Sequence, residues 1–215
     1  MKKILWMMIA IVAIATSCAR SDESFNSSIM HSEDFTGILG DDTRTMLDGT
    51  AVKWCSDDLL TIFTKTSHNR KYKIKSLNDN GCSATFEYES YTNADNSAIS
   101  SNYALYPYDI SASLSGDVIT TTIAAEQAYN SERTDLSYAL MVAKSDNTTF
   151  TFSNAGALLR FNISKIVPDS FTLKSITLSS AANKLSGEVI INTATDCKAI
   201  VSDSGSNEVA LTNIN

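Results

Sequence analysis

The chain has few of the residues that catalysis and metal binding usually require. Histidine occurs twice, at His31 and His68, and glutamine occurs once. The chain therefore has too few histidines to build an imidazole-based acid–base site or a histidine-rich metal site. The sequence also contains no C-x-x-C pair, no P-loop and no G-x-S-x-G motif. We expect a protein that is not an enzyme and that holds neither a metal ion nor a cofactor.

Positive charge is scarce as well. The chain has 17 Lys and Arg against 24 Asp and Glu, a formal net charge of −7. Its lysines are scattered, whereas nucleic-acid binding needs clustered Lys and Arg, so nucleic acid is not an expected partner. Ser, Thr and Asn, in contrast, make up 68 of the 215 residues. Such a composition favours strands and turns over helices and predicts an all-β, exported protein.

Residues 1–17 have the pattern of an export signal. Lys2 and Lys3 precede an apolar run from Ile4 to Ala15. As a helix this run would be about 18 Å long, which is well short of the ~30 Å hydrocarbon core of a bilayer. We therefore predict a signal peptide and not a membrane-spanning helix.

The signal ends in Ala15-Thr16-Ser17-Cys18, which resembles the lipobox of bacterial lipoproteins, although Ala15 stands where leucine is commoner. There the thiol of Cys18 would receive a diacylglycerol and anchor the chain in outer-membrane lipid, because two or more acyl chains hold a protein stably. The alternative is an ordinary secretory cleavage site with an incidental cysteine.

Residues 18–34 are predicted to form a flexible acidic tether. Ser21, Asp22 and Glu23 follow Cys18 closely and resemble the surface-export signal of lipoproteins in some Gram-negative anaerobes. The alternative is a simple solvated linker, since short acidic runs are usually disordered. We expect a lipid-anchored protein of the outer membrane or cell surface of a Gram-negative bacterium.

From Phe35 onward, apolar residues alternate with polar ones, which is typical of antiparallel strands with one buried face. The clearest alternations contain Tyr72 and Ile74, Ala84 to Tyr88, Phe150 and Phe152, and Leu159 to Ile163. Lys71, Lys73 and Lys75 share one face, and we interpret them as protection of a sheet edge. The closely spaced strand candidates predict a β-sandwich with one short helix, over residues 131–139.

A domain boundary is predicted near Asp146-Asn147. Residues 35–147 would form an N-terminal β-sandwich, and residues 148–215 a partial C-terminal β-sandwich. The second half has five candidate strands, which are few for an independent sandwich; they are residues 149–152, 158–163, 171–178, 187–191 and 207–212.

Several short motifs follow one another in a specific order. They are Thr43-Arg44-Thr45-Met46-Leu47-Asp48-Gly49 with Val52-Lys53-Trp54, Asp57-Asp58-Leu59-Leu60-Thr61-Ile62-Phe63, Tyr103-Ala104-Leu105-Tyr106-Pro107-Tyr108, Ala139-Leu140-Met141-Val142-Ala143, Ala157-Leu158-Leu159-Arg160-Phe161 and Leu185-Ser186-Gly187. With this ordered set, the chain from about Phe35 to Ile191 resembles the fimbrillin family. These surface lipoproteins include structural and accessory subunits of type V pili.

The resemblance implies two tandem antiparallel transthyretin-like (Greek-key) β-sandwiches, the second incomplete here. It also implies assembly by donor-strand insertion, in which a protease removes an N-terminal strand after a basic residue and a strand of another pilus subunit fills the groove. Phe35–Leu39 is then the candidate removable strand and Arg44 the candidate cleavage site. There are two alternatives to cleavage at Arg44. In one, Arg44 is an exposed strand residue that is not cut; in the other, the protease cuts after Arg20.

The implied function is that of a fimbrial structural, tip or accessory subunit that mediates adhesion to a host protein or glycan. Family members continue beyond the strand after Leu185-Ser186-Gly187. A chain that ends at Asn215 would lack a donor strand, as expected of a tip or terminating subunit, or it is a truncated gene product.

A stand-alone glycan-binding lipoprotein is the alternative function. Trp54, Tyr103, Tyr106 and Tyr108 are its candidate ligand aromatics, because flat rings stack on sugars. Packing of these rings in the core is the interpretation we favour. Besides Cys18, the chain has three cysteines, Cys55, Cys82 and Cys197, and an odd number cannot all form disulfides with one another. The sequence leaves a Cys55–Cys82 disulfide as one possible pairing.

Overall fold

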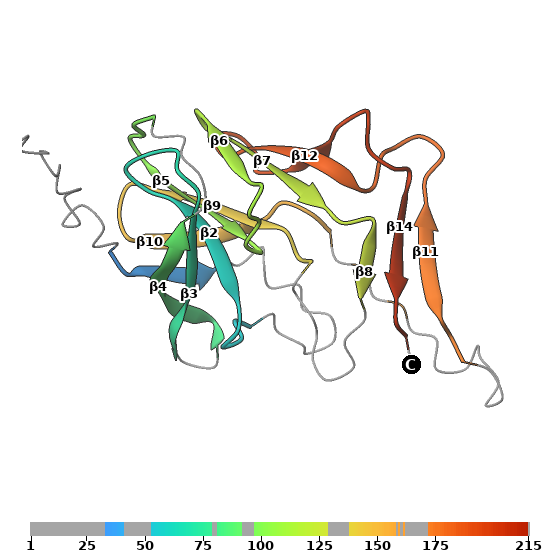
Figure 1. Ribbon diagram of the computed structural model, residues 1–215, viewed down its shortest axis with the longest axis horizontal. Coiled ribbons are helices and arrows are strands. Elements are labelled where there is room, and N and C mark those ends of the chain that lie inside the picture. The colour runs from blue at the N-terminus through green and yellow to red at the C-terminus, as the bar shows by residue number, and fades with distance from the viewer. Residues whose placement is uncertain are drawn as a thin grey trace, which may run out of the picture. The chain divides into compact units, whose positions relative to one another are not determined.

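The computed structural model describes residues 33–40, 53–78, 81–91, 97–128, 138–157, 159, 161 and 172–214. All fourteen elements within these residues are strands, so the all-β prediction is confirmed (Figure 1). The strands are β1 (Phe35–Leu39), β2 (Leu59–Phe63), β3 (Arg70–Asn78), β4 (Ser83–Tyr91), β5 (Asn102–Tyr106), β6 (Ser113–Ser115), β7 (Val118–Ile123), β8 (Glu126–Ala128), β9 (Met141–Ser145), β10 (Thr149–Asn154), β11 (Ser175–Ser179), β12 (Gly187–Asn192), β13 (Ala199–Val201) and β14 (Glu208–Thr212).

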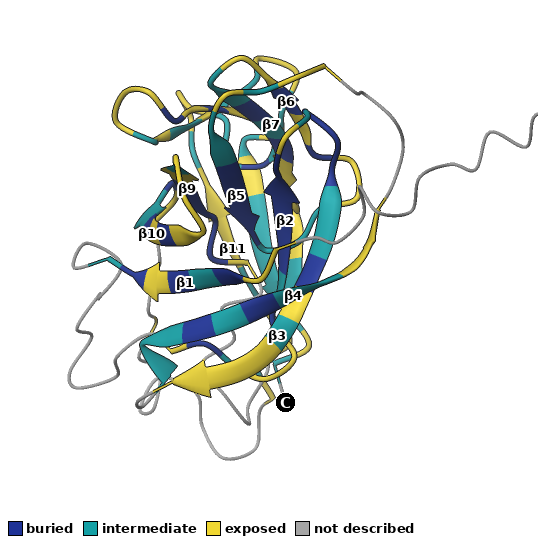
Figure 2. Cartoon of the chain, turned by 90° about the vertical axis from the view of Figure 1, so that its left-hand side faces the viewer, coloured by how far each residue is buried: buried dark blue, intermediate teal, exposed yellow. Residues whose placement is uncertain are grey.

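Seven of the strands form one closed, barrel-like sheet. Their order is β1-β10-β9-β5-β2-β3-β4, and β4 pairs again with β1. Every neighbouring pair is antiparallel except β1 and β10, which run parallel. Figure 2 shows buried and partly exposed residues alternating along β4, as the period-two pattern predicts.

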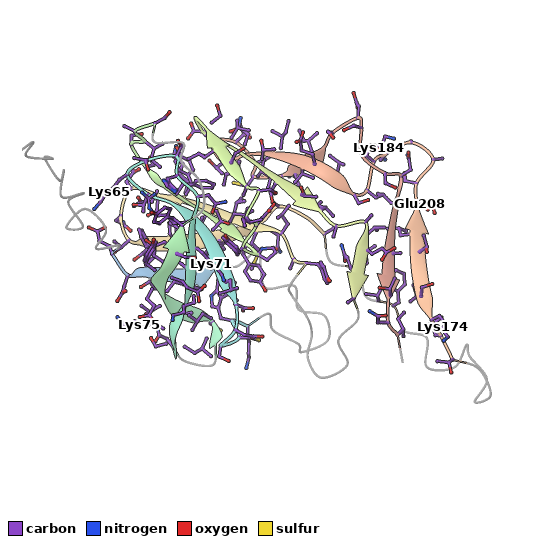
Figure 3. All side chains as sticks on the ribbon, viewed as in Figure 1. Lys65, Lys71, Lys75, Lys174, Lys184 and Glu208 are labelled. Carbon is purple, nitrogen blue, oxygen red and sulfur yellow. The ribbon has the colours of Figure 1, made fainter. Side chains whose placement is uncertain are left out.

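The lysine face of β3 does not protect an edge, because β3 pairs with β2 on one side and with β4 on the other. Lys71 and Lys75, which are labelled in Figure 3, form ion pairs with carboxylates of neighbouring segments. Lys71 Nζ lies 2.7 Å from Glu89 Oε2 on β4, and Lys75 Nζ lies 2.6 Å from Asp34 Oδ2, just before β1. An outward face of a closed sheet has the same alternation as an edge strand, so the sequence pattern did not distinguish the two.

A second sheet packs against the closed sheet. It has the order β13-β12-β7-β6. β5 is buried on both faces: Ala104 and Tyr106 enter the core inside the closed sheet, while Tyr103 and Leu105 enter a second core. The second core also contains Ile119 of β7 and the buried side of β12. The two layers give the sandwich character that the sequence predicts.

The predicted boundary near Asp146-Asn147 is not where the sheets divide. These two residues form the turn between β9 and β10, where Asn147 Oδ1 accepts a 2.8 Å hydrogen bond from the Thr149 amide. β10 lies inside the closed sheet, and β12 pairs with β7 of the first half. Ser, Asp and Asn are as common in hairpin turns as in linkers, which explains the error.

The later strands agree with the sequence only in part. β12 and β14 lie where strands were predicted, and β11 overlaps the predicted segment 171–178. β14 joins β11 and β8 in a three-stranded sheet, antiparallel to β11 and parallel to β8. In the predicted segment 158–163, Leu159 and Phe161 are in no strand and are 61% and 47% exposed. β13 was not predicted.

Several predictions lie outside the described residues. These are the signal peptide over 1–17, residues 18–32 of the tether and most of the helix expected over 131–139. Within the part of the chain that is described, no helix has the length and apolar character needed to cross a membrane.

Candidate functional site

The space that β1 fills between β4 and β10, here called the β1 slot, is the candidate functional site. β1 closes the sheet through both of its edges. The amide of Thr36 donates to the carbonyl of Thr148 at 2.8 Å. At the other end, the amide of Leu39 donates to the carbonyl of Cys82 at 3.1 Å. This five-residue strand is therefore held by main-chain hydrogen bonds to two neighbours.

Alternate side chains of β1 enter the core. Phe35 is fully buried and Leu39 is 3% exposed, whereas Ile38 is 37% exposed on the outer side. The Phe35 ring stacks on Phe150, with centroids 5.2 Å apart, and meets Tyr72 edge-on at 5.5 Å. Burying each large apolar side chain contributes about 2 kcal/mol. β1 thus binds its slot by apolar burial as well as by hydrogen bonds.

Gly37 stands at the middle of β1, where the strand passes over two aromatic rings. A Cβ atom at this position would lie 2.8 Å from Phe86 Cε2 and 3.2 Å from Phe152 Cε2. Sequence reasoning identified the strand but missed this close approach. A glycine inside a strand pattern was the available signal, because it often marks a site where another group comes near the backbone.

Trp54 belongs to the same core. It is 3% exposed, and its ring meets Phe86, Tyr106 and Phe152 edge-on at centroid distances of 5.2, 5.5 and 5.3 Å. Its amide donates to the carbonyl of Gly81 at 2.8 Å. The interpretation of Trp54 as a core aromatic is confirmed, and the interpretation as a ligand platform is wrong because no ring face is exposed.

Tyr103 and Tyr106 are buried too, at 4% and 2% exposure. The hydroxyl of Tyr106 donates to Asp58 Oδ1 at 3.0 Å inside the closed sheet. The hydroxyl of Tyr103 donates to Asp117 Oδ1 at 2.7 Å, and Lys144 Nζ lies 5.5 Å from the centre of its ring. The hydrogen bond from Lys144, and then that from Tyr103, hold the pKa of Asp117 below its usual range. Neither ring is available to stack on a sugar.

Tyr108 is the candidate aromatic that keeps partial exposure. It lines a groove of about 350 Å³ together with Pro107 and Tyr138. The ammonium of Lys71 lies 5.4 Å from the centre of its ring. The four predicted aromatics therefore do not form one coplanar, exposed platform, because three of them are core residues.

A polar network that the sequence did not reveal joins the two layers at Asp109. Its carboxylate accepts hydrogen bonds from Thr121 Oγ1 and Ser111 Oγ, both at 2.6 Å. Its carbonyl accepts from Asn69 Nδ2 at 2.9 Å. Burial raises the pKa of Asp109, but the hydrogen bonds from Ser111 and Thr121 outweigh it, and the net pKa lies below the ordinary value. The ionised carboxylate is therefore the form that stabilises the fold.

Asp109→Asn is expected to lower the free energy of unfolding by about 2 kcal/mol near neutral pH, because it removes charge-assisted hydrogen bonds. A depressed pKa gives stability that is present above the ordinary value near 4 and is lost as pH falls through the lower, folded value. The gap between wild type and variant should therefore shrink below about pH 4 in urea titrations. Asp203→Asn, at an exposed position, is the control. A gap that stays constant with pH would contradict the role of the carboxylate.

Other predicted site residues lie outside the described residues: Cys18, Ser21, Asp22, Glu23 and Arg44. Arg44 belongs to the connection 41–52, which joins Gly40, directly after β1, to Lys53. Cys55, Cys82 and Cys197 are described, and no disulfide joins any of them, so the possible Cys55–Cys82 bridge is not formed.

Within the described ranges, no three His, Cys, Asp or Glu side chains gather into a group that could hold a metal ion. Comparison of the chain with protein-family models, with curated protein sequences and with solved structures finds no match.

Proposed function

We propose that this chain is a non-enzymatic, fimbrillin-like surface lipoprotein that serves as a structural, tip or accessory subunit of a type V pilus. It assembles by donor-strand insertion, and the β1 slot is its assembly site. One observation carries the proposal: β1 completes the closed sheet, yet its chain connection to the rest of that sheet is the segment 41–52, which contains Arg44.

Removal of β1 gives the slot its binding properties. β4 and β10 lose their shared neighbour, so each presents a row of unpaired backbone groups. Between them lie the fully buried rings of Phe86, Phe150 and Phe152, which lose the cover of Phe35 and Leu39. An apolar floor between two unpaired strand edges binds an extended segment of another chain by β-strand addition.

The remaining features of the proposal come from the sequence. Cys18 is acylated, and residues 21–23 direct export to the outer face of the outer membrane. The partners are other pilus subunits and an adhesion ligand, a host protein or glycan. The transthyretin-like topology and an incomplete, tandem second sandwich also belong to the proposal.

Arg44→Ala is expected to block assembly, because the connection after β1 then stays uncut and β1 keeps its slot. An arginine-specific protease should convert the wild-type protein into species that migrate as an SDS-resistant ladder, with fibres in electron micrographs. The variant should remain a single precursor band. Arg20→Ala is the control, since a cut there releases only the anchor. Normal laddering of the Arg44→Ala protein would refute cleavage at this residue.

A further inference from the structure

We propose that the β1 slot selects its incoming strand by two glycines. The partner is an extended segment of another protein chain with the pattern large apolar–any–Gly–any–large apolar–Gly. This inference rests on the proposed strand exchange and adds the chemistry of the strand that enters. Phe35, Gly37 and Leu39 of β1, with Gly40 directly after it, have this pattern. The residues that surround them in the slot require these residue types at these positions.

The first glycine is required because two rings lie under the middle of the strand. A Cβ at Gly37 would meet Phe86 Cε2 at 2.8 Å, closer than real Cβ contacts. The rings have little room to turn away, because both are fully buried and the Trp54 ring packs edge-on against each of them. Adding one carbon to such a packed core forces strain on the strand or on the rings.

The second glycine faces the backbone of β10. A Cβ at Gly40 would lie 2.5 Å from the carbonyl oxygen of Phe152, which also accepts the Gly40 N–H at 3.1 Å. A main-chain carbonyl inside a closed sheet moves less readily than a side chain. Phe152 therefore restricts the incoming strand twice, with its ring at the third position and its carbonyl at the sixth.

The other positions set the rest of the pattern. The first and fifth residues need large apolar side chains, because Phe35 packs on Phe150 and Tyr72, and Leu39 is buried in the same core. The second and fourth residues face outward, as the 37% exposure of Ile38 shows, and impose little restriction. Specificity thus resides in the inward-facing first, third and fifth residues and in the sixth, where the backbone of β10 leaves no room for a side chain.

The pattern is rare in this sequence. Among its 215 residues, two glycines three positions apart occur once, at Gly37 and Gly40. The segment Leu185-Ser186-Gly187-Glu188-Val189 matches the first five positions but continues with Ile190. β1 itself is therefore the reference ligand, and any other donor must carry the same pair of glycines.

The test uses the full chain with residues 43–49 replaced by the recognition sequence of a site-specific protease, so that it does not depend on Arg44. The cut protein is unfolded in urea and refolded with an equimolar fluorescent peptide of residues 33–40, which competes with the chain's own β1. Gel filtration measures the peptide that is retained. Peptides with Gly37→Ala or Gly40→Ala should be retained at least about tenfold less than the wild-type peptide. The Thr36→Ala peptide, altered on the outer face, should match the wild type.

The outcomes separate the two proposals. Alanine reduces the conformational freedom of a free peptide relative to glycine, so an entropic effect would favour the substituted peptides and cannot imitate the expected loss. Equal retention of the wild-type and Gly→Ala peptides would overturn glycine selection and leave strand exchange intact. If the wild-type peptide is not retained at all, strand exchange fails, and the inference fails with it.

Discussion

Trp54→Ala is expected to lower the free energy of unfolding by about 4 kcal/mol, among the largest losses that one substitution produces in this fold. The indole is 3% exposed and contacts three aromatic rings from β4, β5 and β10. Its removal leaves a cavity in the middle of the closed sheet, and both the transfer energy and the cavity contribute to the loss. Urea titration followed by circular dichroism measures the effect.

Two variants serve as controls for this prediction. Trp54→Phe retains an aromatic ring and should cost clearly less than alanine. Phe161→Ala removes an aromatic ring that is 47% exposed, and we expect a change of under about 0.5 kcal/mol. A Trp54→Ala loss as small as that of Phe161→Ala would show that the indole is not part of the core.

The sequence predicted the class of the fold because antiparallel strands with one buried face have a period of two. Ala84 and Phe86 of β4 and Phe150 and Phe152 of β10 are buried as that period requires. A period of two identifies strands, but it does not show which strands lie next to one another in a sheet. The positions of β10 next to β1 and of β12 next to β7 depend on contacts between distant segments, so the boundary at Asp146-Asn147 was misplaced.

The candidate site was predicted in part for the same reason. Its strand, Phe35–Leu39, is a local pattern and was identified. The restriction at Gly37 arises from rings of β4 and β10, which are distant along the chain. The network at Asp109 joins Asn69, 40 residues earlier, to Thr121, 12 residues later. Burial of Trp54 was the favoured interpretation, since large aromatics beside strands usually lie in the core.

Phe35→Ala is expected to weaken the hold of the slot on β1, with a different consequence before and after the chain is cut. In the intact chain the variant should lower the free energy of unfolding by about 3 kcal/mol, because a fully buried ring that stacks on Phe150 is lost. The connection 41–52 nevertheless keeps β1 near its slot at high effective concentration.

After cleavage in the connection 41–52 that advantage is gone, and retention of β1 depends on protein concentration. The same loss of about 3 kcal/mol then corresponds to retention that is roughly 100-fold weaker. Dilution of the cut Phe35→Ala protein should release the strand at concentrations where the cut wild type keeps it. Fluorescence of Trp54, which packs on the ring of Phe152 beneath β1, reports the release.

Thr36→Ala, on the outer face of β1, should behave as the wild type. If the cut Phe35→Ala protein retains β1 as firmly as the wild type, apolar burial at this position does not hold the strand. The affinity of the slot would then have to come from the backbone hydrogen bonds alone.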